Sequence, residues 1–288
     1  MKSIASKKAG PGAPSTYISH NLTRLYMHCN FGLGQIYSKY HIPKSNETIR
    51  KTMDRVIDNI IQKNFDGESP KNRCFITVIG YNNDAKELCS GYLKDLDAHP
   101  LRRDSIKKKV SDGAGGIVEV ETLMPIWVEP IRHDGTTNMK GAFELSKAII
   151  ERWINDNPDS PAPVIINISD GAPYYNHKEI ADCMKETAEV ARDIMNISVA
   201  DGNVLIFNAL IRESGLRREF PTSLDECPTD EAQFLYSISS FVPDAYQGIA
   251  QVKELNVKEG SKGCIFEADE VQLISLIDFG SSKGQRDI

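Results

Sequence analysis

The sequence predicts an α/β fold in which a mostly parallel β-sheet is covered by helices on both faces. Continuous apolar runs rich in β-branched residues are one reason, because strands buried on both faces of a parallel sheet have this composition. Segments with apolar residues at helical spacing lie between these runs. Strands that alternate with helices of this length are typical of doubly wound α/β proteins.

The elements are expected in a regular order along the chain. A strand comes first, and a helix follows it with Ser45 or Asn46 as the candidate N-cap. Further strands and helices then alternate. The strands are expected at residues 22–30, 74–81, 164–168 and 204–210. The helices are expected at residues 49–61, 139–153, 180–195, 231–242 and 271–279.

Residues 111–132 interrupt this alternation. After a glycine-rich turn, Val118 and Val120 alternate with Glu119 and Glu121, as in a half-exposed strand, and two prolines favour an edge position. We expect an insertion or a hairpin on the rim of the sheet. A solvated, partly helical face is expected at the preceding basic cluster, Arg102, Arg103, Lys107, Lys108 and Lys109.

Composition restricts the class of protein. The 288 residues are 40% hydrophobic and 26% charged, as in a globular protein that buries a sizeable core. We expect a disordered tail at residues 1–17 and a single domain at residues 18–288. The net charge of −6 and the lack of a basic stripe argue against nucleic acid as a partner.

Cysteine usage and hydropathy predict a cytoplasmic protein. The six cysteines contain no CxxC pair and no metal-ligand spacing with histidine, which favours a reducing compartment. No stretch approaches the ~18 consecutive apolar residues of a membrane span, and no apolar stretch follows the N-terminal lysines as in a signal peptide. No membrane association is expected.

Three polar segments are expected at the carboxyl ends of strands, where open parallel sheets bind their ligands. They are residues 30–35 (NFGLGQ), 134–139 (DGTTNM) and 168–172 (ISDGA). The second and third resemble the von Willebrand factor A (vWA) pattern, in which a Gly-Thr loop opens a helix and a strand ends in Thr/Ser-Asp-Gly. The resemblance covers residues 20–280 and implies a Rossmann-like vWA fold. The matching residues are Gly135, Thr137, Ser169, Asp170 and Gly171.

The resemblance also implies a metal-ion-dependent adhesion site, but this sequence departs from it. The family's Asp-x-Ser-x-Ser motif falls on residues 30–34, so that asparagine replaces the aspartate, and Gly32 and Gly34 replace both serines. Thr137 and Asp170 are the residual metal ligands. Because Mg²⁺ needs about six hard oxygen ligands, we expect weak binding or none, and no other cofactor. Ser38 or Ser45 could still supply a replacement ligand.

In that fold the same loops form a partner-binding face. Tyr174 and Tyr175 follow the Asp-Gly turn, where they could serve as a hot spot for protein contact. Alternatively, they pack the loop against the next helix. The resemblance implies an adaptor in a bacterial signalling, stress or defence system, with a Ser/Thr kinase or protein phosphatase as its partner. The expected face comprises Asn30, Gly32, Gly34, Thr136, Thr137, Asn138, Asp170, Tyr174 and Tyr175.

Two other functions remain open from the sequence. One is a metal-dependent (Mg or Mn) adhesion-type receptor domain. The other is a hydrolase-like α/β enzyme that uses Asp170 with His177 or Cys29. Because His28 and Cys29 are adjacent on a strand, they point to opposite faces, and no nucleophile, base and orienting group emerge together. We therefore expect a protein that is not an enzyme, with no catalytic residues.

Overall fold

The computed structural model describes residues 26–32, 44–111, 113, 116–129, 136–169, 171–211 and 217–282, with the backbone alone at 26–32, 44–50, 52, 108 and 270. The expected N-terminal tail lies outside these residues. Among the described helices, none has the length and apolar character that crossing a membrane requires.

The centre of the molecule is a seven-stranded sheet. Its strands are β1 (Tyr26–Gly32), β4 (Phe75–Tyr81), β5 (Ala85–Tyr92), β8 (Val164–Ser169), β11 (Leu205–Leu210), β12 (Arg218–Glu219) and β13 (Cys264–Phe266). The spatial order is β12-β13-β11-β8-β1-β4-β5, with antiparallel pairing only at the two edges, between β4 and β5 and between β12 and β13. From β1 the chain thus builds the sheet outward through β4 and β5 on one side and through β8 and β11 on the other, as in a doubly wound fold.

Three small antiparallel pairs lie outside the central sheet. β6 and β7 form a ribbon of ten residue pairs, whereas the other two pairs are two-residue hairpins. Their bounds are β2 (Phe65–Asp66), β3 (Ser69–Pro70), β6 (Arg102–Ser111), β7 (Ile117–Ile126), β9 (Ser198–Val199) and β10 (Gly202–Asn203).

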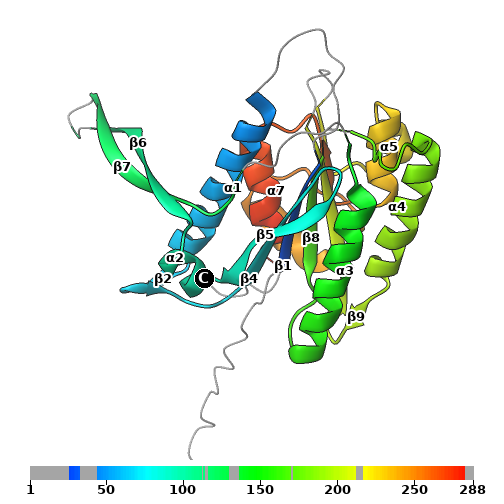
Figure 1. The fold of residues 1–288 in the computed structure, drawn as a ribbon, viewed down its shortest axis with the longest axis horizontal. Helices are drawn as coiled ribbons and strands as arrows, with labels where there is room; N and C mark the ends of the chain where they lie inside the picture. Colours follow the sequence, from blue (N-terminus) through cyan, green and yellow to red (C-terminus); the bar gives the residue numbers. More distant parts are fainter. Residues whose placement is uncertain are drawn as a thin grey trace, which may run out of the picture.

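Helices cover both faces of the sheet (Figure 1). They are α1 (Lys44–Lys63), α2 (Leu93–Ala98), α3 (Met139–Asp156), α4 (Ile180–Met195), α5 (Asp230–Ser237), α6 (Gln247–Val252) and α7 (Glu270–Gly280). α1 and α7 pack against one face with the short helices α2 and α6, and α3, α4 and α5 pack against the other. The predicted fold class, α/β with a mostly parallel sheet covered on both faces, is therefore confirmed.

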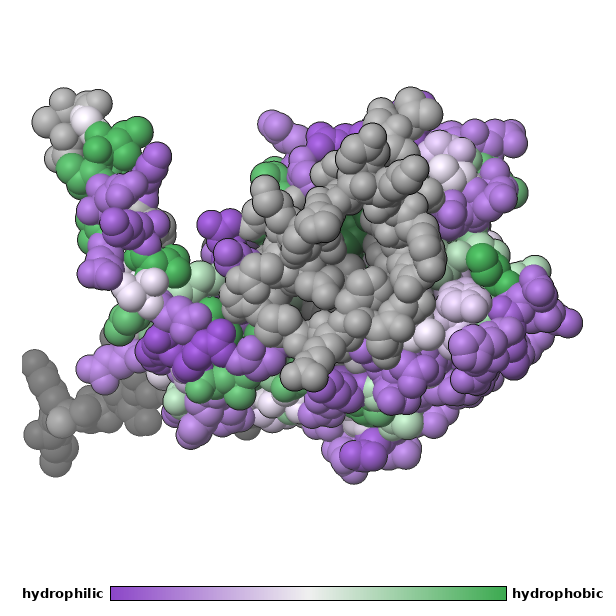
Figure 2. Space-filling model, turned by 45° about the horizontal axis from the view of Figure 1, so that its top comes forward, coloured by the Kyte–Doolittle hydropathy of each residue, from purple (hydrophilic) through white to green (hydrophobic). Residues whose placement is uncertain are grey.

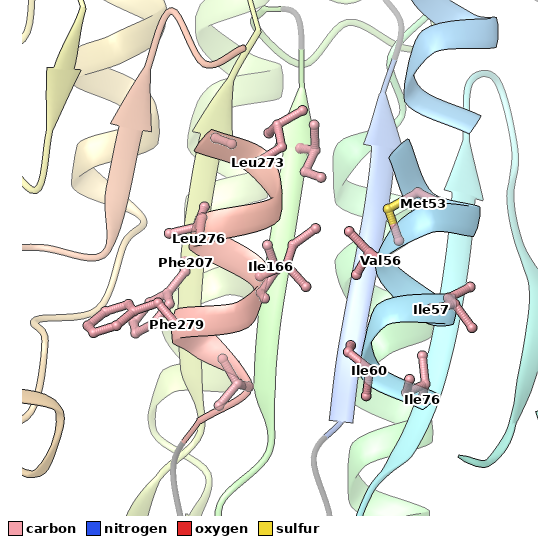
Figure 3. Close-up of a cluster of buried hydrophobic side chains, with 14 of the residues drawn as sticks. Met53, Val56, Ile57, Ile60, Ile76, Ile166, Phe207, Leu273, Leu276 and Phe279 are labelled. Atoms are coloured by element: carbon pink, nitrogen blue, oxygen red, sulfur yellow. The ribbon is translucent and has the colours of Figure 1, made fainter. Parts of the chain in front are cut away.

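The core between α1, α7 and the sheet follows from the apolar spacing of the two helices. Their buried side chains recur every three or four residues and face the strands (Figure 3). Phe207 on β11 stacks on Phe279 at a centroid distance of 6.1 Å. A Cβ atom at Gly263 would lie 2.1 Å from the Phe207 ring, so this position requires glycine. The labelled side chains are Met53, Val56, Ile57, Ile60, Ile76, Ile166, Phe207, Leu273, Leu276 and Phe279.

Several predicted boundaries are wrong. α1 begins at Lys44, so the candidate caps Ser45 and Asn46 lie inside the helix. α5 ends at Ser237 instead of residue 242. The basic cluster expected to be partly helical forms strand β6, because its residues pair with β7 along their whole length. The expected hairpin exists, but it forms a separate ribbon and not the rim of the central sheet.

Candidate functional site

The candidate site lies at the carboxyl ends of β1, β4 and β8. β1 pairs in parallel with both neighbours, so the three strands end along the same edge of the sheet. The chain leaves β1 for α1 on one face and enters β8 from α3 on the other. Ligands of open parallel sheets bind where the winding changes direction in this way.

Two of the three predicted loop segments meet at this edge. The backbone N–H of Thr137 donates to the carbonyl oxygen of Tyr174 at 2.7 Å, and the N–H of Tyr174 donates back to Thr137 at 3.0 Å. These bonds form an antiparallel bridge between the loop before α3 and the loop after β8. The bridge fixes the positions of the two loops relative to each other.

Asn138 fastens this bridge to a third loop. Its Oδ1 accepts the N–H of Gly141 at 2.9 Å, which caps α3. Its backbone N–H donates to Asn82 O at 2.7 Å, and its Nδ2 donates to Asn83 O at 2.9 Å. The side chain of Asn138, expected on the partner-binding face, is therefore occupied in holding the β4–β5 turn against α3.

The hydroxyl of Thr137 is buried and has no hydrogen-bond partner among the described residues. Thr137 is 0% exposed, and its Oγ1 is one of two such buried side-chain oxygens in the part of the chain described, together with Oγ1 of Thr77. Burying an unsatisfied hydroxyl costs about 1–3 kcal/mol. A group left in this state at a switch point can serve a ligand or partner, whereas Thr136 beside it is only half-buried.

The hydroxyl of Ser169, in contrast, makes its hydrogen bonds to Gly171, two residues along the chain. Its Oγ accepts the N–H of Gly171 at 3.2 Å and donates to the carbonyl oxygen of Gly171 at 3.0 Å. These bonds join the two residues that flank position 170 in the sequence. Asp170 itself lies outside the described residues, as does Gly34.

The placement of the first loop has to be corrected. The first strand was expected to end at Asn30, with Gly32 in the turn after it, but β1 continues through Gly32. The reason is that the strand has partners on both sides: Asn30 pairs with Ile79 and Asn167, and Gly32 pairs with Tyr81 and Ser169. Asparagine and glycine usually end strands, but here two neighbouring strands supply the backbone hydrogen bonds.

A buried polar network lies beneath the loops, and the sequence interpretation missed it. The Oη of Tyr81 donates to Asn167 Oδ1 at 3.0 Å, and Asn167 Nδ2 donates to Asn208 Oδ1 at 2.8 Å. Asn208 Nδ2 continues to Ser239 Oγ at 2.8 Å. Asn167 also lies beside Asn30 in the register. The signal available in the sequence was an asparagine in each of three otherwise apolar strands.

The two tyrosines of the predicted face, Tyr174 and Tyr175, differ in how deeply they are buried. Tyr174 is half-buried, but Tyr175 is 3% exposed and its hydroxyl donates to Glu186 Oε2 on α4 at 3.1 Å. Burial and the neighbouring Glu186 raise the pKa of Tyr175 above its ordinary value. Tyr175 therefore packs the loop against the next helix and is not an exposed hot spot. Asn176 and His177 beyond it are exposed.

Three buried or half-buried cysteines do not have the properties of nucleophiles. Burial raises the pKa of the thiols of Cys74 and Cys89 to about 12, and that of Cys227 to about 11. Such thiols remain protonated at neutral pH, and catalysis by cysteine requires the thiolate. Within the described ranges, no three His, Cys, Asp or Glu side chains gather as a metal-binding group. Thr137 is thus the predicted metal ligand that the structure describes.

No family model matches the sequence, and no curated protein matches it. Solved structures do resemble the chain. The VWA2 paralogue of ArnB from Sulfolobus acidocaldarius is 17% identical over 67% of this chain and 36% of that chain, with a TM-score of 0.35. The vWF domain of the type V pili tip protein Mfa5 from Porphyromonas gingivalis is 9% identical over 92% and 98%, with a TM-score of 0.44.

Proximal thread matrix protein 1 from the mussel byssus, solved with a zinc-occupied MIDAS motif, is 12% identical over 92% of this chain and 47% of that chain, with a TM-score of 0.42. The chain spans 36% to 66% of the length of the first structures it resembles. At these identities the likeness concerns the fold alone. The architecture follows from the chain's own strand order, and it is the doubly wound α/β fold that the alternating strands and helices predicted.

Proposed function

We propose that this chain is a non-catalytic protein-binding module of the vWA type. Its binding face would be the loop edge around Thr137 and Tyr174. The observation that most supports this proposal is the Thr137–Tyr174 bridge, which holds two loops from distant parts of the chain in fixed positions. Pre-organised loops bind a partner without the entropic cost of ordering them first.

The partner class that we propose is a Ser/Thr kinase or a protein phosphatase in a bacterial signalling, stress or defence system, with the chain acting as an adaptor in the cytoplasm. The support for this is the family resemblance. The high pKa values of the buried thiols support a role in binding over covalent catalysis.

Affinity capture with the full chain as bait tests the proposed face. Tyr174→Ala removes a half-buried side chain at the bridge, whereas Val252→Ala changes an 85% exposed residue on α6. A partner that uses the face should be enriched by the wild type and by Val252→Ala, and lost at least about tenfold with Tyr174→Ala, as removal of a central contact does. Equal enrichment by all three baits would contradict the proposal.

A metal-dependent adhesion module is the second candidate, and the Thr137 hydroxyl, which has no partner among the described residues, favours it. We expect weak Mg²⁺ binding or none, because Ser169 is engaged in its own turn and Asn30 lies within β1. Thermal unfolding of chelator-treated protein with millimolar Mg²⁺ or Mn²⁺ tests this. Binding to the folded state alone would raise Tm. A rise of several degrees that disappears in Thr137→Val would establish the metal-dependent alternative.

A further inference from the structure

We draw no further inference here: the strongest candidate, the β6–β7 ribbon that projects as an arm beyond α1 and α2 (Figure 1 and Figure 2), exposes apolar side chains on both of its faces, and nothing among the described residues shows what covers them.

Discussion

Thr137 combines two features that a purely structural residue would not need. Its backbone makes both hydrogen bonds of the bridge to Tyr174, while its side-chain hydroxyl is fully buried without a partner among the described residues. Valine has nearly the same shape and would fill the same space without burying an unsatisfied hydroxyl. The hydroxyl therefore contributes no hydrogen bond to the stability of the described structure.

Thr137→Val should therefore stabilise the free protein. Removing an unsatisfied buried hydroxyl while keeping the shape of the side chain should raise the free energy of unfolding by about 1 kcal/mol, as measured by urea denaturation. Thr187 on α4 is an equally buried control, because its hydroxyl donates to Cys183 O at 2.7 Å. Thr187→Val should bring no such gain. A loss of stability in Thr137→Val would mean that the hydroxyl has a partner in the free protein.

At the scale of elements, the sequence was most informative where the signal is local. The buried strands β4, β8 and β11 and the helices α3 and α4 were predicted within a few residues, because apolar runs and helical spacing reflect burial directly. β6 was misread as partly helical, because a run of lysines has no apolar periodicity and the glutamates that pair with it lie on β7. The three-residue strand β13 was too short to give a pattern.

The candidate site, too, was predicted from the sequence only in part. The sequence predicted the loops around Thr137 and Tyr174, and the structure joins them by two hydrogen bonds. It did not predict that β1 continues past Asn30 to Gly32, since this depends on pairing with β4 and β8 on both sides. Nor did it predict the bond between Asn167 and Asn208, which depends on the strand register.

The two helices on one face of the sheet are joined by a carboxylate. Asp278 on α7 is 2.9 Å from Lys63 on α1 and also forms an ion pair with Lys253. Burial alone would raise the pKa of Asp278, but the hydrogen bonds from Lys253 and Lys63 outweigh this effect and hold the pKa below its ordinary value. The carboxylate therefore stabilises the folded state above the unfolded pKa, near 4, and this contribution is lost as the pH falls through the lower folded pKa.

Asp278→Asn should accordingly lower Tm at pH 7, and its difference from the wild type should shrink as the pH falls below about 4. Melting curves between pH 7 and pH 2 measure this convergence. Asp225→Asn, an exposed substitution in the 3-10 turn before α5, is the control and should follow the wild type at each pH. A difference for Asp278→Asn that stays constant with pH would exclude the ion pairs as its cause.

At the scale of the whole molecule, two separate surfaces share one core. The loop edge lies at the carboxyl ends of the central strands, and the β6–β7 arm projects from the side of α1 and α2 (Figure 1). Trp127 and Val128 follow directly after β7 and belong to the same buried cluster as Val56 and Ile57 of α1. The base of the arm is thus part of the core that supports the sheet, although its tip is exposed.

Asp54→Ala should therefore destabilise the whole domain and not only release the arm. The substitution leaves two buried N–H groups, of Trp127 and Val128, without their acceptor, which should lower the free energy of unfolding by about 2–4 kcal/mol. Leu123→Thr, at a 63% exposed position of the same ribbon, should change it by less than about 0.5 kcal/mol. Hydrogen exchange distinguishes the two mechanisms: amides of β4 and β8 should exchange faster in Asp54→Ala, whereas faster exchange in β6 and β7 alone would show that the arm unfolds as an independent unit.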